Sequence, residues 1–141
     1  MRFVDLEPGD ERLRGEVFAV LGELRTQLTP QALEQVYAEG HPQGLRFTAL
    51  YEDDRCVAVA GWRLLATTVS MRKLYVDDLV TAAAERGRGH GAALLGELAR
   101  RARQEGCRVL DLDSGTQRTD AHRFYLRERM SITSLHFTLP L

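Results

Sequence analysis

The fold is decided by the stretch Glu85-Arg86-Gly87-Arg88-Gly89-His90-Gly91-Ala92-Ala93-Leu94-Leu95. Its alternating glycines offer only main chain, and they follow an apolar, strand-like segment at 74–80. Glycine allows close approach and unusual backbone angles, while the first turn of a helix presents unpaired N–H groups with a partial positive charge. The stretch therefore predicts a loop at a helix N-terminus that cradles an anion, most often a phosphate or pyrophosphate.

The residues after the loop predict the helix itself, because small and apolar residues recur there at three- and four-residue spacing. These residues are Gly91, Leu94, Leu95, Leu98, Ala99 and Ala102. A glycine-rich turn without any ligand is the alternative interpretation of so short a motif.

Two familiar anion-binding patterns fit the loop poorly. A P-loop needs a lysine and then a hydroxyl residue after its last glycine, but two alanines follow Gly91. The dinucleotide fingerprint fits Gly87, Gly89 and Ala92. In that fold, however, the glycines follow the strand almost at once, and too little chain remains after Asp111 to complete a doubly wound sheet.

A third pattern, Arg-x-x-Gly-x-Gly, is met by Arg86, Gly89 and Gly91. It resembles the pyrophosphate loop of the GCN5-related N-acetyltransferases (the GNAT superfamily), which bind acetyl-coenzyme A. A second motif, Ala121-His122-Arg123-Phe124-Tyr125, is similar to the A-x-x-F-Y segment of the same family. The resemblance covers residues 74–130 well and the N-terminal half only by the order of its elements.

Bulk composition favours one compact domain over residues 1–141, since 141 residues at 44% hydrophobic support a real core. A net charge of −1 does not support general affinity for nucleic acid. No apolar run approaches membrane-spanning length and no signal-peptide core is visible, so we expect a cytoplasmic protein. Cys56 and Cys107 suit buried, reduced thiols, and neither lies in a cluster with metal-ligand spacing. We therefore expect no metal.

Periodicity and turn signals predict a mixed α/β chain, with an antiparallel front half and a right-handed β-α-β unit behind it. The predicted strands are 2–7, 45–52, 56–65, 71–81, 108–113 and 132–139, and the predicted helices are 10–28, 30–38, 90–104 and 121–129. Together with the resemblance, this order implies a central twisted mixed sheet of about six to seven strands flanked by about four helices.

The resemblance implies acetyl-coenzyme A as co-substrate, held mainly by main-chain groups. The residues that would hold its pyrophosphate are Arg86, Gly87, Arg88, Gly89, His90, Gly91 and Ala92. Leu79, Val80 and Thr81 would pair with the pantetheine arm, because a strand that splays from its neighbour leaves backbone groups for the two amides of pantetheine. Arg118 stands where many family members carry asparagine, so we expect it to contact phosphate or pantetheine instead.

The resemblance also implies which side chains would carry the chemistry. Tyr125 would be the general acid that protonates the departing thiolate. Asp77 and Asp78 interrupt an apolar strand, where acids are otherwise unfavourable. We expect Asp77 to be the general base and Asp78 a structural acid or a substrate contact, on opposite faces of the strand. His136, in the last predicted strand, is a further substrate contact.

These residues predict an N-acetyltransferase that uses acetyl-coenzyme A. A primary amine, on a small molecule or a peptide, would attack the bound thioester directly, since no serine or cysteine has a convincing nucleophile setting. A non-catalytic acyl-coenzyme A sensor of the same fold is the alternative, and a nucleotide-dependent oxidoreductase is a weaker one. A homodimer that pairs through the late strands is compatible with the resemblance. The family's usual Gly-Phe after the tyrosine helix is replaced by Arg129-Met130, so the left-handed cap that glycine favours is in question.

Overall fold

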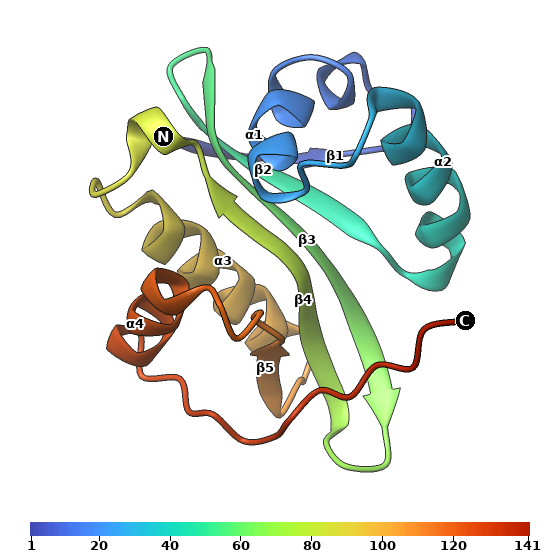
Figure 1. The fold of residues 1–141 in the computed structure, drawn as a ribbon, viewed down its shortest axis with the longest axis vertical. Coiled ribbons are helices and arrows are strands. Elements are labelled where there is room, and N and C mark those ends of the chain that lie inside the picture. Colours follow the sequence, from blue (N-terminus) through green and yellow to red (C-terminus); the bar gives the residue numbers. More distant parts are fainter. The chain divides into compact units, whose positions relative to one another are not determined.

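The computed structural model describes residues 1–141 as five strands and four α-helices, joined by turns and three short 3₁₀ helices (Figure 1). The elements are β1 (Arg2–Leu6), α1 (Glu16–Leu24), α2 (Pro30–Gly40), β2 (Arg46–Glu52), β3 (Arg55–Thr67), β4 (Met71–Thr81), α3 (His90–Gln104), β5 (Val109–Leu112) and α4 (Thr119–Arg127). They form two compact units, Met1–Asp111 and Leu112–Leu141. The mixed α/β class is confirmed, but the sheet has five strands rather than six to seven.

The sheet has the order β1-β2-β3-β4-β5, and its first four strands pair antiparallel, which confirms the predicted antiparallel front half. β5 lies beside the first part of β4, where the Arg108 N–H donates to the Arg72 carbonyl at 2.9 Å and Lys73 pairs with Asp111 at 2.9 Å. β5 is only 4 residues long. It therefore ends before Leu79–Thr81, and no strand pairs with that last part of β4 on the side away from β3.

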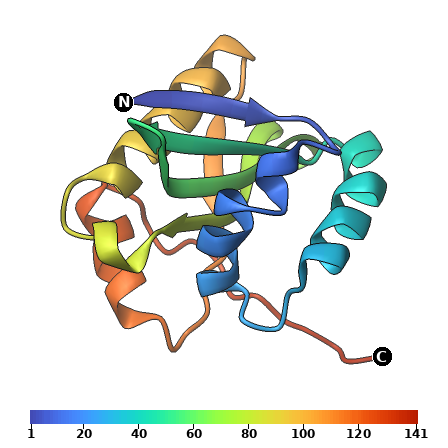
Figure 2. The same cartoon turned by 90° about the horizontal axis from the view of Figure 1, so that it is seen from above.

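Helices α1 and α3 pack on opposite faces of β3 and β4 (Figures 1 and 2). Because both faces are covered, β2 is buried along most of its length and its apolar residues do not alternate with polar ones. The buried stripe of α3 matches the predicted helix face; its buried apolar members are Leu94, Leu95, Leu98 and Ala102.

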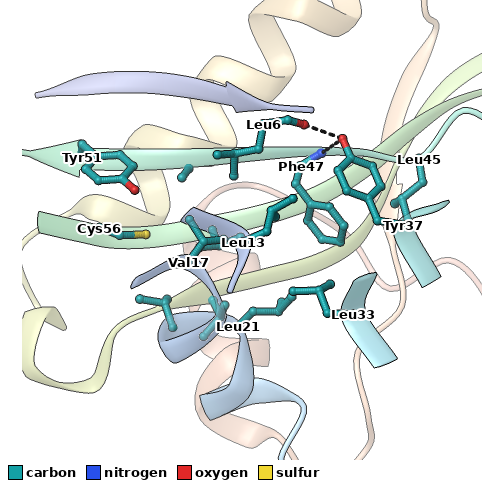
Figure 3. Close-up of a cluster of buried hydrophobic side chains, with 14 residues drawn as sticks. Leu6, Leu13, Val17, Leu21, Leu33, Tyr37, Leu45, Phe47, Tyr51 and Cys56 are labelled. Atoms are coloured by element: carbon teal, nitrogen blue, oxygen red, sulfur yellow. Dashed lines mark hydrogen bonds between the residues drawn. The ribbon is translucent and has the colours of Figure 1, made fainter. Parts of the chain in front are cut away.

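The core on the α1 and α2 face is organised by a buried tyrosine (Figure 3). The Tyr37 hydroxyl donates to the Leu6 carbonyl at 2.6 Å and accepts the Phe47 N–H at 3.4 Å. The two rings meet edge to face with centroids 4.8 Å apart. Tyr37 thus fastens α2 to β1 and β2, and this fixes one wall of the cavity described below.

The predicted continuous helix over 10–28 is wrong. A 3₁₀ turn, Glu11–Leu13, comes first, and Asp10 caps it by accepting the Arg12 N–H at 3.0 Å. Gly15 then leaves the helical region with φ −103° and ψ −117°, so α1 starts only at Glu16. The apolar stripe continues through the break, which is why periodicity alone could not reveal it.

The predicted strand at 132–139 is also wrong, because residues 130–141 form neither helix nor strand. The apolar side chains that suggested it are exposed: 77% for Leu135, 88% for Phe137 and 82% for Leu139. A period of two favours a strand, but a strand exists only by pairing with neighbouring backbone. No helix of the chain combines the length and apolar character needed to cross a bilayer.

Helices α3 and α4 end in the same hydrogen-bonded motif, with different residues at its left-handed position. After α3, Gly106 has φ +72°, and the Gly106 and Cys107 N–H groups donate to Arg103 and Ala102. After α4, the residue in that position is Arg129, with φ +66°. The cap therefore persists without glycine, and arginine carries the steric cost of a left-handed backbone.

We expect Arg129→Gly to raise the free energy of unfolding by about 1 kcal/mol, because glycine removes the contact of the arginine Cβ with the main chain. The matched control is Gly106→Arg, where an added Cβ meets no atom within 4 Å and only the backbone angle is unfavourable. It should lower stability by a similar amount. Urea unfolding followed by circular dichroism measures both, and shifts in the same direction would contradict the explanation.

Candidate functional site

The glycine loop lies between β4 and α3 and has the backbone that the sequence predicts. Gly87 has φ +79° and Gly89 has φ +81°, both in the left-handed region. A Cβ added to either would meet no atom within 4 Å. The glycines are therefore required by backbone angle and not by protein packing, and both residues are exposed.

The first turn of α3 receives no hydrogen bond from a capping side chain, because its N-cap residue is Gly89. The first N–H groups of an α-helix, here including those of His90, Gly91 and Ala92, have no intrahelical acceptor. The Arg88 side chain is 60% exposed beside them, and Arg86 is also exposed. Open main-chain donors, a helix dipole and arginines together suit a phosphate or diphosphate.

The side chain of His90 points into the protein and is only 6% exposed. Its Nε2 lies 3.1 Å from a Glu52 oxygen and 3.8 Å from a Glu85 oxygen. Glu85 also accepts from Arg55 at 2.5 Å and from Arg88 at 3.1 Å. These contacts hold the loop against the domain. Both guanidinium groups contact Glu85, whereas the Glu52 carboxylate contacts the His90 ring, and the ligand atoms of Glu52, Glu85 and His90 lie within 4.8 Å of one another. Because its ring is turned inward, His90 can serve the cradle only through its main-chain N–H.

Strand β4 contains a bulge at the acidic pair. Gly61 of β3 faces Asp78, whereas its neighbour Trp62 faces Val76, so Asp77 has no partner on β3. A bulge interrupts the alternation of a strand and redirects its side chains. The expectation that Asp77 and Asp78 lie on opposite faces assumed a regular strand, and the pairing of β4 with β3 shifts register at this point.

Asp77 forms a two-pronged ion pair. Its two carboxylate oxygens accept from Arg63 Nε at 3.0 Å and from the Arg63 Nη2 at 2.9 Å. Both side chains are 22% exposed. A fork of this kind fixes both partners and occupies the two oxygens, which makes Asp77 a structural group of the bulge.

Asp78 has a different environment. Its Oδ1 accepts from Arg25 Nε at 2.8 Å, its side chain is 15% exposed, and its Oδ2 accepts no hydrogen bond from the protein. Burial raises the pKa of the Asp78 carboxyl above the ordinary aspartate value, and the hydrogen bond from Arg25 offsets only part of that rise. Gly61 makes the room, because a Cβ there would lie 2.7 Å from Oδ2 and 2.9 Å from the Phe47 ring.

Asp78 and Arg25 line a cavity of about 510 Å³ between the α1–α2 segment and the sheet. Most of the remaining lining is apolar: Leu21, Leu28, Ala32, Leu33, Val36 and Phe47, with Thr26 and Gln27 as its other polar residues. A cavity of this size with a few converging polar groups is typical of a small-molecule site.

The unit Leu112–Leu141 carries the other predicted site residues. Tyr125 is half-buried on α4, with its ring edge to face against Phe124 at 5.4 Å between centroids. Arg118 is the N-cap residue of α4 and offers no side-chain cap. His136 is 67% exposed and lies 3.6 Å from Asp113. Tyr125 and Arg118 thus share one helix, whereas His136 lies in the irregular C-terminal segment.

Sequence reasoning missed Arg25, Arg63 and the cavity. A lone arginine after an amphipathic helix carries no signal of its partner, since Arg25 and Asp78 are brought together only by the packing of α1 on the sheet. Gly61 could have been noticed, because an isolated glycine within a strand pattern indicates a bulge or a close approach.

Comparison with known proteins gives a consistent result. The sequence profile of the acetyltransferase (GNAT) family matches residues 15–129. An uncharacterized N-acetyltransferase of Bacillus subtilis (strain 168) is 34% identical over 119 residues, 84% of this chain and 83% of that protein. An aminoalkylphosphonate N-acetyltransferase of Salmonella typhimurium is 38% identical over 66 residues, 47% of this chain and 43% of its own length.

Among solved structures, the aminoglycoside N-acetyltransferase AAC(6')-Iy in complex with CoA superimposes with a TM-score of 0.83 at 14% sequence identity. The match covers 99% of this chain and 93% of that one. This likeness shows a shared fold.

The raised pKa of Asp78 predicts the effect of Asp78→Asn on stability. A folded-state pKa above the unfolded value means that ionised Asp78 disfavours folding once the pH exceeds both values. We therefore expect Asp78→Asn to raise the melting temperature at pH 7 to 8, and the gain should shrink as the pH falls through the raised pKa. The matched control is Asp77→Asn, which breaks the Arg63 fork and should lower the melting temperature at pH 7. Stabilisation by Asp78→Asn that did not vary with pH would contradict this account.

Proposed function

This chain belongs to the acetyltransferase (GNAT) family, and on that premise we propose that it is an acetyl-coenzyme A-dependent N-acetyltransferase. Its acceptor is a primary amine that attacks the bound thioester directly. The relative that acts on aminoalkylphosphonates, by its name, supports a small-molecule acceptor. Acetyl-coenzyme A, when bound, supplies the acetyl group as an activated thioester.

The observation that carries the proposal is the glycine loop. Gly87 and Gly89 are left-handed and open, and the first turn of α3 is free of any side-chain cap. These features fit a diphosphate, which the N–H groups from Gly87 to Ala92 would bind, with Arg86 and Arg88 contributing charge. The CoA complex of a neighbour with the same fold supports the same ligand.

The end of β4 suits the pantetheine arm. Because β5 is short, the Leu79–Thr81 main chain has no strand partner on one side. Backbone groups there are available to hydrogen-bond the amides of an extended ligand, as an added strand would. On this proposal β4 orients the thioester, and Arg118 is an additional contact to the cofactor. Such orientation is worth up to about 7–11 kcal/mol of the barrier.

We assign the general base to Asp78 in preference to Asp77. Asp78 lines the cavity, has one oxygen free of protein hydrogen bonds, and has a pKa raised by burial. A base works best when its pKa lies near the working pH, so the shift is in the useful direction. Both oxygens of Asp77 are held by Arg63, which suits a positioning residue that maintains the bulge.

Tyr125 is the proposed general acid, whose hydroxyl would protonate the departing sulfur. Direct transfer, without an acetyl-enzyme, agrees with the state of the cysteines. Burial raises the pKa of the Cys56 thiol to about 12, which leaves almost no thiolate at neutral pH. Cys107 follows the C-terminal end of α3, a whole helix length from the glycine loop.

We expect Gly89→Ala to weaken coenzyme A binding by at least about tenfold, because alanine strains the left-handed N-cap and adds a methyl group to the open face of the cradle. Gly96→Ala is the matched control. It lies in the same helix, exposed, with nothing within 4 Å of the added Cβ. It should leave affinity unchanged and stabilise α3 by about 1 kcal/mol. Isothermal titration calorimetry with coenzyme A measures both, and equal affinities in the two variants would refute the cradle.

We expect Tyr125→Phe to lower kcat by about 10²–10⁴ with little change in coenzyme A affinity, because only the hydroxyl is removed. Release of the free thiol from acetyl-coenzyme A in the presence of amines measures the rate. A non-catalytic sensor predicts a different result: tight coenzyme A binding in both proteins and no thiol release with any amine.

A further inference from the structure

The cavity combines two opposite charges with an apolar wall. The carboxylate of Asp78 and the guanidinium of Arg25 are in direct contact at 2.8 Å, and both line the same space. The wall beside them consists of Leu28, Leu33 and Val36 together with the Phe47 ring. An acceptor that fits all three features carries a cation, an anion next to it, and an apolar body.

Part of the Arg25 guanidinium is still available to bind a ligand. Its Nε donates to Asp78 and its Nη2 donates to the Asp77 carbonyl at 3.0 Å, whereas its Nη1 donates to no protein group. The side chain is 51% exposed. A guanidinium anchored at one end and open at the other is well suited to a carboxylate. Oδ2 of Asp78 is open in the same way and suits an ammonium group.

Resting on the proposed function, we infer that the acceptor is a free α-amino acid with an apolar side chain. Its ammonium group pairs with Asp78, its carboxylate with Arg25, and its side chain lies against the apolar wall. One carbon separates the two charges of an α-amino acid, which matches two protein charges that touch each other. A simple amine could pair with Oδ2 of Asp78 but would leave the open end of the Arg25 guanidinium without an anion.

The reaction balances with these groups. The amine nitrogen forms a bond to the acetyl carbon while the carbon–sulfur bond breaks and the sulfur leaves with the bonding pair. The ammonium nitrogen loses two protons, one to Asp78, which passes it to solvent, and one directly to solvent. The sulfur gains one proton from Tyr125, which is reprotonated from solvent, so the net reaction releases one proton. The product is an N-acetyl amino acid, which has lost the positive charge. It no longer pairs with Asp78 Oδ2, so the product keeps only one of the two ion pairs of the substrate and binds more weakly, while Arg25 stays hydrogen-bonded to Asp78.

The test compares amino acids with their decarboxylated counterparts in the thiol-release assay. The pairs are L-phenylalanine with phenethylamine and L-leucine with 3-methylbutylamine, and L-aspartate serves as a polar control. We expect kcat/KM to be at least about tenfold higher for each apolar amino acid than for its amine, and L-aspartate to react poorly. Faster reaction of the amines, or of L-phenylalaninamide, would overturn the inference in favour of an amine or a peptide N-terminus.

Arg25→Gln supplies the matched variant. Because Arg25 also holds Asp78, kcat should change for both substrates, but KM for L-phenylalanine should rise at least about tenfold more than KM for phenethylamine, a split that a merely structural role would not produce. Equal losses for both substrates would overturn the assignment of Arg25.

The two proposals fail in different ways. Acetylation of a polyamine such as spermidine, with no amino acid acetylated, refutes the proposed amino acid acceptor but supports the proposed N-acetyltransferase activity. A second outcome is that L-leucine raises the melting temperature of the wild type but not of Arg25→Gln, while no amine is acetylated. This outcome supports the amino acid binding site and refutes the enzymatic function. Absence of both effects overturns both proposals.

Discussion

The candidate acceptor site depends on one extra residue in β4. Insertion of Asp77 opposite the Gly61–Trp62 step breaks the ladder between β3 and β4. The carbonyl of Asp77 thereby becomes an acceptor for Arg25, and its carboxylate is clamped by Arg63. Asp78, the next residue, is left at the cavity wall with one oxygen open. A regular strand would have provided none of these positions.

Strand β4 also connects the two halves of the proposed site within the unit Met1–Asp111. Its bulge faces the cavity beside α1 and α2, and its C-terminal end leads through Glu85 into the glycine loop. The loop is held by contacts of Glu85 and His90, and the cavity wall by the hydrogen bonds of Tyr37. Both halves therefore rest on buried side chains, of which Glu85 and Tyr37 are hydrogen-bonded to other elements.

The ionised side chain of Asp78 lowers the stability of the folded state. A carboxylate in an apolar wall is unfavourable, and its raised pKa expresses that cost. Perturbed carboxylates of this kind concentrate at functional sites, although structural ion pairs also produce them. Asp77, beside it, illustrates the structural case, because its charge is matched by a fork from Arg63. Of these two adjacent aspartates, Asp77 therefore stabilises the folded state through its ion pair, and Asp78 destabilises it when ionised.

Local sequence determined the elements whose signals are local: the glycine loop and its helix, the Thr29-Pro30 start of α2, and the antiparallel meander. It also indicated the anion cradle, because glycine spacing and a helix start lie next to each other in the chain. Only the tertiary structure decided that Arg25 meets Asp78, that Arg63 holds Asp77, and that Leu135 to Leu139 form no strand. Those outcomes depend on contacts between residues distant in sequence. A pattern of side chains cannot specify such contacts until packing brings the partners together.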